Sequence, residues 1–214
     1  MSDNLSLAAL SPTETTRERI KNTAAALFAN CSYPTTSLAS IAKSCEVSKS
    51  LIYHYYRDKA EILFDIANGH VQRLLYIVNE SKTMPFSNSS EELGYLISEF
   101  MREYETSSNC HSVLVQDLKF LPPEKSELIR SAERKIVDHF TTLITLAKDD
   151  ALETRPAVMR ALTMLLFGMM NWTFTWLDPK GTLSFEEVGL LIKYLFIGAL
   201  SGQDDSVSLL PKFL

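Results

Sequence analysis

The sequence has few of the residues and motifs on which enzymes and cofactor-binding proteins depend. Only seven of its 214 residues are glycine, and they form no glycine-rich loop for phosphates. It also shows no nucleophile-elbow serine, no cluster of metal ligands and no paired carboxylates for acid–base catalysis. We therefore expect neither an enzyme nor a bound cofactor. Hydrophobic residues (46%) and charged residues (22%) occur in the proportions typical of an ordered globular protein.

Cysteine and histidine are also scarce. Cys31, Cys45 and Cys110 are odd in number, far apart and outside any C-x-x-C motif. Because the N-terminal residues show no signal-peptide pattern, we expect reduced thiols and a cytoplasmic location. The four histidines lack the spacing of metal ligands, so no metal site is predicted.

The most apolar run, Ala161 to Leu177, is short for a membrane span. Its 17 residues would form a helix about 26 Å long, whereas the hydrocarbon layer is roughly 30 Å thick. The run also contains Thr163, Asn171 and Thr173. We therefore predict no membrane contact, and interpret the run as a helix buried on one side in its own core and on the other against a partner.

Charge is unevenly distributed along the chain. The formal net charge is −5, but residues 13–62 hold seven Lys and Arg against five Asp and Glu. This segment therefore carries +2 and the remainder −7. A locally positive segment in an acidic protein is compatible with binding to nucleic acid, because the charge near the phosphates matters more than the total.

The segment from Thr35 to Lys59 predicts two short helices joined by a tight turn, followed by the start of a third helix. Ser37 and Ser48 are suitable N-caps for the two short helices. Asp58 and Glu61 have the spacing of a capping box, so the third helix should begin at Lys59. This arrangement is a helix-turn-helix, whose second helix can enter the major groove of DNA.

The polar residues of this segment predict a DNA contact surface. A core helix would carry apolar residues on that face, whereas here lysine, tyrosine and serine side chains can reach phosphate oxygens. The predicted contact residues are Thr36, Ser37, Ser48, Lys49, Ser50, Leu51, Tyr53, His54, Tyr55 and Lys59.

The run TSLASIAKSCEVSKSLIYHYYRDK, residues 36–59, resembles the DNA-binding signature of the TetR family of bacterial repressors. The matching parts are T-S before the first helix, I-A-x-x-x-x-V-S across the turn and Y-x-Y-Y-x-x-K into the next helix. The family usually has glycine at Glu46, at Ser50 and near Cys31-Ser32, so this chain lacks backbone freedom at those turns. The resemblance implies an all-α fold, with a three-helix DNA-binding head (residues 11–58) and a ligand-binding and dimerisation body (residues 59–214).

Apolar periodicity and capping residues predict the remaining helices. They are expected from Ser11-Pro12 to about Asn30, from Lys59 to about Lys82, from a cap at Ser89 and Glu92 to Tyr104, from His111 to Phe120, from Pro123 to about Lys148, from Ala157 to Leu177, and from a cap at Ser184 and Glu187 to Ala199. The last two are apolar enough to suggest a two-fold, four-helix dimer interface, as in the TetR family. Such a dimer would bind a palindromic operator, one half-site per head.

Large apolar residues on the middle helices are the candidates for an effector pocket. They are Phe100, Met101, Tyr104, Leu114, Met164, Phe167, Trp172 and Trp176. Residues 165–188 and L-P-P-E at 121–124 are similar to TetR-type repressors that respond to acyl-CoA thioesters in the breakdown of fatty acids, steroids or phenylacetate. That similarity implies an acyl chain among the helices and a cation for the CoA phosphates, with Arg102, Lys119 and Arg130 as candidates.

Two functions remain open from the sequence. The first is a repressor released from DNA by a small hydrophobic or acyl-CoA-type effector. The second is a dimeric DNA-binding regulator that is controlled by a protein partner and has no small-molecule ligand.

Overall fold

The computed structural model describes residues 15–148, 155–178 and 180–201. This part of the chain consists of helices without a strand, as the sequence predicts. The elements are α1 (Thr16–Cys31), α2 (Leu38–Ser44), α3 (Lys49–Tyr55), α4 (Lys59–Ser81), α5 (Ser89–Thr106), α6 (Ser108–Asp117), the 3-10 turn η1 (Leu118–Phe120), α7 (Pro123–Ala147), α8 (Pro156–Asn171), the 3-10 turn η2 (Trp172–Thr175) and α9 (Phe185–Leu200).

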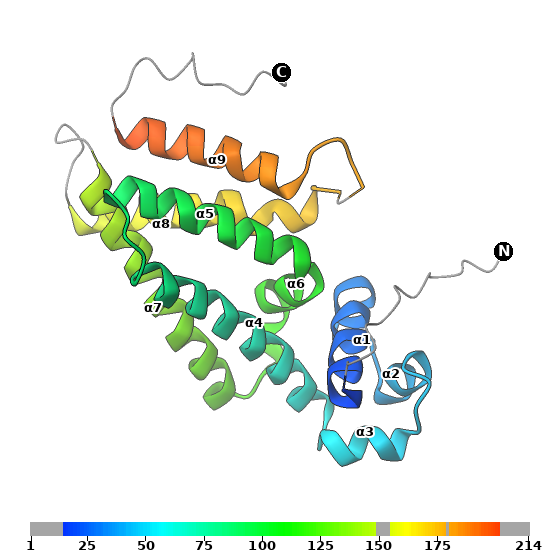
Figure 1. The fold of residues 1–214 in the computed structure, drawn as a ribbon. Helices are drawn as coiled ribbons and strands as arrows, with labels where there is room; N and C mark the ends of the chain where they lie inside the picture. The colour runs from blue at the N-terminus through cyan, green and yellow to red at the C-terminus, as the bar shows by residue number, and fades with distance from the viewer. Residues whose placement is uncertain (1–14, 149–154, 179, 202–214) are drawn as a thin grey trace.

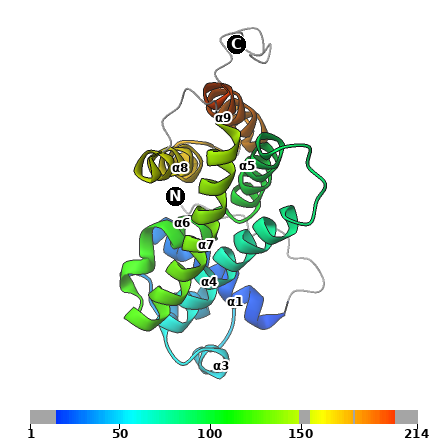
Figure 2. The ribbon, with the colours of Figure 1, turned by 90° about the vertical axis from the view of Figure 1, so that its left-hand side faces the viewer.

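The helices form a small head and a larger body (Figure 1). Helices α1, α2 and α3 make the head, and α3 lies at the far end of the molecule from α9 (Figure 2). Helix α4 begins at the head and continues into the body, where it packs against α5, α6 and α7. Helices α5 and α7 pack together and against α8 and α9, while α6 lies between α4 and α1. Both α4 and α6 therefore connect the head to the body.

Side-chain caps set most of the helix starts. The hydroxyls of Ser37 and Ser48 accept hydrogen bonds from backbone N–H groups in α2 and α3, and the Asp58 carboxylate does the same for α4, as predicted. The predicted start of the first helix at residues 11–14 lies outside the described residues. Within them, α1 begins after a capping box formed by Thr15 and Glu18.

Three predicted boundaries are wrong. The cap of α5 is Asn88, one residue before the predicted Ser89, because the Asn88 side chain accepts from the Glu91 N–H at 2.9 Å. The expected break before α6 is a single residue, Ser107. Helix α8 ends at Asn171 and not at Leu177. There the Thr173 hydroxyl donates to the Met170 carbonyl, a local hydrogen bond that competes with continued α-helix.

A continuous apolar core runs from the head into the body. In the body, the ring centroids of Phe100 and Phe140 are 5.2 Å apart, and those of Phe140 and Phe167 are 4.9 Å apart. These distances are typical of attractive aromatic pairs. The rings join α5, α7 and α8 at the centre of the body.

The segment from Pro156 to Thr175 is long and apolar enough to cross a membrane by length and composition alone, with a mean hydropathy of 1.2. Core helices of soluble proteins pass the same test, and α8 packs here against α7 and α9. The segment is therefore weak evidence for a membrane span. One third of it is buried, so much of its apolar surface faces outward.

Two residues outside glycine have positive φ in the described chain, and both lie where TetR-type sequences usually have glycine. Ser32, which ends α1, has φ 70° and ψ 149°, and Glu46, in the turn between α2 and α3, has φ 56°. The Ser32 conformation is close to a region that is almost restricted to glycine. Two hydrogen bonds hold the backbone in this conformation, because the Ser32 carbonyl accepts from both the N–H and the hydroxyl of Thr36.

We expect the substitution Ser32→Gly to raise the free energy of unfolding by about 1 kcal/mol. Glycine removes a backbone strain of about 1–3 kcal/mol but adds about 0.5–1 kcal/mol of chain entropy to the unfolded state. Urea unfolding followed by circular dichroism measures the change. The control is Ala26→Gly in the interior of α1, which should lower stability by about 0.5–1 kcal/mol. A loss of stability in both variants would show that Ser32 is not strained.

Candidate DNA-binding surface and ligand pocket

Helix α3 presents polar side chains outward and one apolar side chain inward. Ile52 is fully buried, whereas Lys49, Ser50, Tyr53 and His54 are exposed. The Lys49 ammonium lies 5.8 Å from the centre of the Tyr53 ring. Cationic, hydroxyl and imidazole groups therefore share one accessible face, which can approach phosphates and base edges.

Four more of the predicted contact residues flank that face. Ser48, at the start of α3, is exposed, and Leu51 and Tyr55 are half-buried. The Tyr55 ring packs edge-on against His54, with centroids 5.0 Å apart. Ser37 is exposed and its hydroxyl caps α2. DNA contact by each of these four residues stays a prediction.

The remaining two predicted contact residues hold the head together. Thr36 is buried, and its hydroxyl donates to the Ser32 carbonyl at 2.9 Å. The Lys59 ammonium donates to the Tyr33 carbonyl at 2.7 Å and to the Thr36 carbonyl at 2.8 Å. It also lies 4.2 Å from the centre of the Tyr33 ring. Lys59 thus ties the first turn of α4 to the segment between α1 and α2.

A second polar contact joins α1 to α4. The Arg17 guanidinium lies 3.0 Å from the Asp65 carboxylate, which also accepts a hydrogen bond from the Tyr56 hydroxyl at 2.6 Å. Burial and the Asp65 carboxylate together raise the pKa of Tyr56, so the phenol remains a donor. The pattern of the sequence gives no sign of this cluster, because it joins residues nine to forty-eight positions apart.

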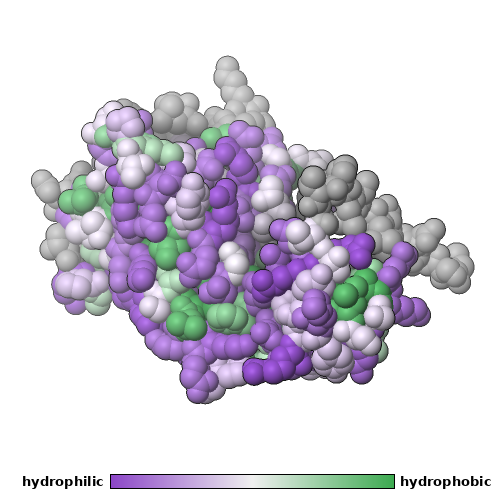
Figure 3. Space-filling model, turned by 60° about the horizontal axis from the view of Figure 1, so that its bottom comes forward, coloured by the Kyte–Doolittle hydropathy of each residue, from purple (hydrophilic) through white to green (hydrophobic). Residues whose placement is uncertain are grey.

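The surface of the molecule on the side of the head is mostly hydrophilic. Figure 3 shows the underside, where small hydrophobic patches are separated by polar residues. Such a surface can meet the hydrated phosphate backbone without burying large apolar areas.

A cavity of about 220 Å³ opens among the helices of the body. Its lining comes from α4, α5, α6, α7 and α8, and is mostly apolar. The lining residues are Val71, Leu74, Phe100, Tyr104, His111, Leu114, Val115, Glu133, Ile136, Val137, Met164, Phe167 and Asn171. Phe100, Tyr104, Leu114, Met164 and Phe167 are among the predicted ligand residues, so the structure brings five of them to one cavity.

The other three predicted ligand residues lie elsewhere. Met101 packs against α9, where a Cβ on Gly189 would lie 3.3 Å from its side chain. Trp172 and Trp176 are 61% and 56% exposed, on and beside η2. They are absent from the cavity because α8 ends at Asn171, and the change to a 3-10 turn rotates the following side chains outward.

At one end of the cavity, Tyr104, Asn171, His111 and His70 form a buried polar group of side chains that the sequence did not predict. The Tyr104 hydroxyl donates to the Asn171 side-chain oxygen at 2.7 Å, and the Tyr104 ring stacks on His111 with centroids 3.7 Å apart. His111 Nε2 lies 3.3 Å from the Asn171 carbonyl, and His111 Nδ1 lies 3.3 Å from His70 Nε2. Because a carbonyl can only accept, Nε2 of His111 holds its proton and Nδ1 accepts from His70.

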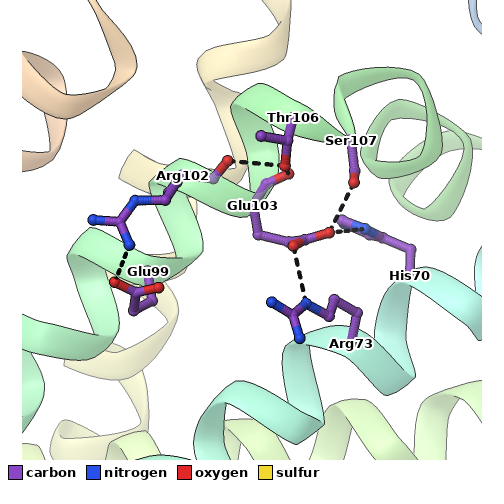
Figure 4. Close-up of polar contacts among 7 residues, drawn as sticks. All are labelled: His70, Arg73, Glu99, Arg102, Glu103, Thr106 and Ser107. Atoms are coloured by element: carbon purple, nitrogen blue, oxygen red, sulfur yellow. Dashed lines mark hydrogen bonds and ion pairs between the residues drawn. The ribbon is translucent and has the colours of Figure 1, made fainter. Parts of the chain in front are cut away.

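His70, on α4, connects this polar group to Glu103 on α5 (Figure 4). His70 Nδ1 lies 3.7 Å from the Glu103 carboxylate, which also contacts Arg73 at 3.3 Å and accepts from the Ser107 hydroxyl at 2.8 Å. Burial raises the pKa of Glu103, but the contacts with His70, Ser107 and Arg73 together lower it below its usual value. Glu103 is therefore held as a carboxylate at the junction of α4, α5 and α6.

None of the three cations predicted to meet CoA phosphates lines the cavity, but Arg130 lies beside a residue that does. It lies on α7, one turn from the cavity-lining Glu133, whose carboxyl its charge influences. Arg102 instead pairs with Glu99 at 2.5 Å on the exposed side of α5. The Lys119 ammonium lies 5.2 Å from the centre of the Phe120 ring. In the described residues, no group of three or more His, Cys, Asp or Glu is placed to hold a metal ion.

We expect Lys59→Met to lower the free energy of unfolding by about 1.5–3 kcal/mol, because the two backbone carbonyls lose a charged hydrogen-bond donor. The matched variant Lys49→Met removes the same charge from the exposed face of α3 and should change stability by less than about 0.5 kcal/mol. Chemical unfolding of both variants at one pH and salt concentration measures the difference. Equal losses would contradict the structural role of Lys59.

We expect His111 to make stability depend on pH. Burial, and then the charge of a protonated His70, lower its pKa from the usual 6.5 to about 3, although the Asn171 carbonyl acts in the opposite direction. The unfolded chain therefore takes up a proton below about pH 6.5 that the folded chain refuses. Stability is complete above that pH and falls by up to about 1.4 kcal/mol per pH unit as the pH drops toward 3.

Urea unfolding of the wild type and of His111→Gln between pH 7.5 and pH 5 tests this expectation. The variant keeps an N–H donor for the Asn171 carbonyl but cannot titrate, so its stability should fall less steeply than that of the wild type. Parallel slopes would show that His111 is not the group responsible.

Comparison with known proteins agrees with this architecture. Residues 87–199 match the family model described as the C-terminal domain of tetracyclin repressor-like proteins, and residues 20–66 match that of bacterial regulatory proteins of the tetR family. A TetR-family transcriptional regulator from Bordetella parapertussis 12822 is 29% identical, with a TM-score of 0.82 over 92% of this chain and 99% of that one.

Two further solved structures share the fold. The ketosteroid transcriptional regulator KstR2 of Mycobacterium tuberculosis is 16% identical, with a TM-score of 0.81 over 89% of this chain and 97% of that one. AibR, in complex with isovaleryl coenzyme A and operator DNA, is 23% identical, with a TM-score of 0.73 over 87% of this chain and 98% of that one. The C-terminal family match alone spans more than half of the sequence. The chain belongs to the TetR family of bacterial transcriptional regulators.

Proposed function

We propose that this regulator is a cytoplasmic repressor that binds a palindromic operator as a homodimer and is released by a small hydrophobic effector, an acyl-CoA thioester. The observation that carries the proposal is the position of the cavity. It is lined by α4, the same helix whose first turn holds the DNA-binding head through Lys59. A ligand in the cavity would therefore touch the helix that positions α3.

The exposed face of α3 supports the DNA-binding part of the proposal. Lys49, Ser50, Tyr53 and His54 are accessible together, and Ser48 fixes the start of the helix. One such helix spans only a half-site of a few base pairs, so two heads about one helical turn of DNA apart are needed for a palindrome.

The outer face of α8 and α9 supports the homodimer. Leu165 on α8 and Leu195 on α9 are 63% and 58% exposed, and Trp172, directly after α8, is 61% exposed. An exposed apolar patch of this kind marks an interaction site, and two antiparallel copies of a helix pair can cover one another. Met164 and Val115, which line the cavity, are also partly exposed, so a partner covering α8 would help to enclose the cavity.

The lining supports an acyl chain as the buried part of the effector. Val71, Leu74, Ile136, Met164 and Phe167 offer aliphatic and aromatic contacts. A volume of about 220 Å³ suits an acyl group and not a whole CoA thioester, so the CoA moiety would lie outside, on the side of Arg130. The fold shared with AibR, solved with isovaleryl coenzyme A and operator DNA, supports this by analogy.

The same lining offers a route for release. A ligand against Val71 and Leu74 bears on α4, and one against His111 bears on α6, which packs on α1. Ligand binding would move α4 and α6 and thereby change the distance between the two heads of the dimer. At the new distance the heads no longer fit the two half-sites, so the ligand shifts the population away from the DNA-competent form.

The second candidate is a dimeric regulator controlled by a protein partner. The exposed apolar residues of α8 and η2 are the observation in its favour, because a partner could cover them instead of a second copy. Mass spectrometry of the purified protein under native conditions separates the two. A retained aliphatic or CoA-bearing ligand would favour the first proposal.

We expect the protein to shift DNA from its own upstream region in a gel, and one acyl-CoA thioester from a panel of chain and ring types to abolish the shift. Free CoA and the free acid should leave the shift unchanged. Binding to DNA that no thioester alters would retain the operator-binding proposal and reject the acyl-CoA effector. The absence of sequence-specific binding at low salt would reject the proposal as a whole.

We expect Lys49→Ala to weaken operator binding by about ten-fold and to lower the salt dependence by about one phosphate contact per head. Fluorescence anisotropy with labelled operator at several salt concentrations measures both effects. The control Lys135→Ala removes the same charge from the exposed side of α7, far from α3, and should bind like the wild type. Equal weakening by the two variants would mean that α3 does not approach the phosphates.

A further inference from the structure

Among the thirteen residues that line the body cavity, Glu133 is the single one with a carboxyl group, and the lining holds no lysine or arginine. The other polar groups at the cavity are largely satisfied by one another. Tyr104 donates to the side chain of Asn171, and His111 donates to the backbone carbonyl of Asn171. Glu133 is the exception, since no hydrogen bond or ion pair engages its carboxyl in the described chain.

The surroundings of Glu133 supply little compensation for its charge. Arg130 and Arg134, which flank it on α7, lower its pKa, but burial is the larger effect and the pKa is raised overall. Arg134 is engaged elsewhere, 2.5 Å from the carboxylate of Glu127. The charge of Glu133 also reaches Tyr104, where burial first and then this carboxylate raise the pKa of the phenol. The Glu133 carboxyl thus lines a mostly apolar cavity, and its oxygens can accept a hydrogen bond from a ligand.

An unpartnered acceptor in an apolar cavity discriminates strongly between ligand head groups. A ligand that carries a hydroxyl, amide or ammonium group can donate to the carboxylate and gain a hydrogen bond. A ligand that carries its own carboxylate places two negative charges together in surroundings of low dielectric constant, and no cation in the lining offsets their repulsion.

We propose that Glu133 selects the class of ligand, admitting apolar chains that end in a neutral or hydrogen-bond-donating group and excluding chains that end in a carboxylate. This inference rests on the proposed function, because it concerns the same cavity. It gives a physical reason why an acyl thioester, which is neutral at its carbonyl, would act as effector while the corresponding free acid would not. The amide N–H groups of a pantetheine arm, or a hydroxyl on the acyl chain, are the donors that Glu133 would accept.

Three ligands with the same eight-carbon chain test this selection without any DNA. Calorimetric titration of the full-length protein at pH 7.5 with octylamine, octanol and octanoate compares a cation, a neutral donor and an anion. We expect the wild type to bind octylamine and octanol at least ten-fold more tightly than octanoate. In Glu133→Gln, octanoate should gain at least ten-fold, octylamine should lose at least ten-fold and octanol should change less than three-fold.

The matched control is Asp138→Asn, which removes a carboxylate from the exposed side of the same helix, where it lies 3.5 Å from Arg160. It should keep the wild-type order, which separates a local effect from a change in net charge. Thermal melting of Glu133→Gln should match the wild type, since the substitution preserves the shape and an acceptor oxygen.

Two results would overturn the inference: octanoate binding to the wild type as tightly as octanol, or the order of the three ligands being unchanged in Glu133→Gln. The expected order together with DNA binding that no effector alters would leave the role of Glu133 intact and remove effector release from the proposed function. The two proposals therefore fail separately.

Discussion

The structure depends on helix α4, a continuous helix that begins at the head and runs into the body, beside the packing of α6 on α1. At the first turn of α4, the Lys59 ammonium is bound to the carbonyls of Tyr33 and Thr36, and Asp65 nearly two turns further on is bound to Arg17 and Tyr56. Three turns beyond Lys59 the same helix supplies His70 and Val71 to the body. Because a helix transmits displacement along its length with little bending, any change in how α4 packs in the body must move the head.

The buried polar group around His70 gives α4 a defined position in the body. Apolar contacts alone would let neighbouring helices slide, but the contacts of His70 with His111 and of His111 with Asn171 are directional and join α4, α6 and α8. The Glu103 carboxylate of α5 lies 3.7 Å from His70 and adds an electrostatic contact. Buried polar groups of this kind are costly unless every partner is present, so they favour one arrangement over its neighbours. The cavity lies against this group, so a ligand that displaces Tyr104 or His111 would disturb the contacts that fix α4.

Local features of the sequence predicted the head well, because caps and turns act over three or four residues. Ser37, Ser48 and Asp58 start the helices where their side chains predict. Two of the three places that lack the expected glycine, Ser32 and Glu46, have positive φ, whereas Ser50 lies inside α3. Contacts between distant residues could not be derived in this way. Neither the pairing of His70 with His111 nor the facing of Glu133 into the cavity follows from any spacing along the chain. The exposed tryptophans were assigned to the pocket because the apolar run was expected to stay helical to Leu177, whereas α8 ends at Asn171 and Trp172 starts a 3-10 turn.

If α4 couples the cavity to α3, binding of ligand and binding of DNA are linked, and such coupling must be reciprocal. The most direct test is to titrate the thioester that releases the protein from DNA into the free protein and into the protein saturated with operator. We predict that operator weakens thioester binding by the same factor by which the thioester weakens operator binding. Equal affinities in the two titrations would contradict the account, because ligand and DNA would then bind independently.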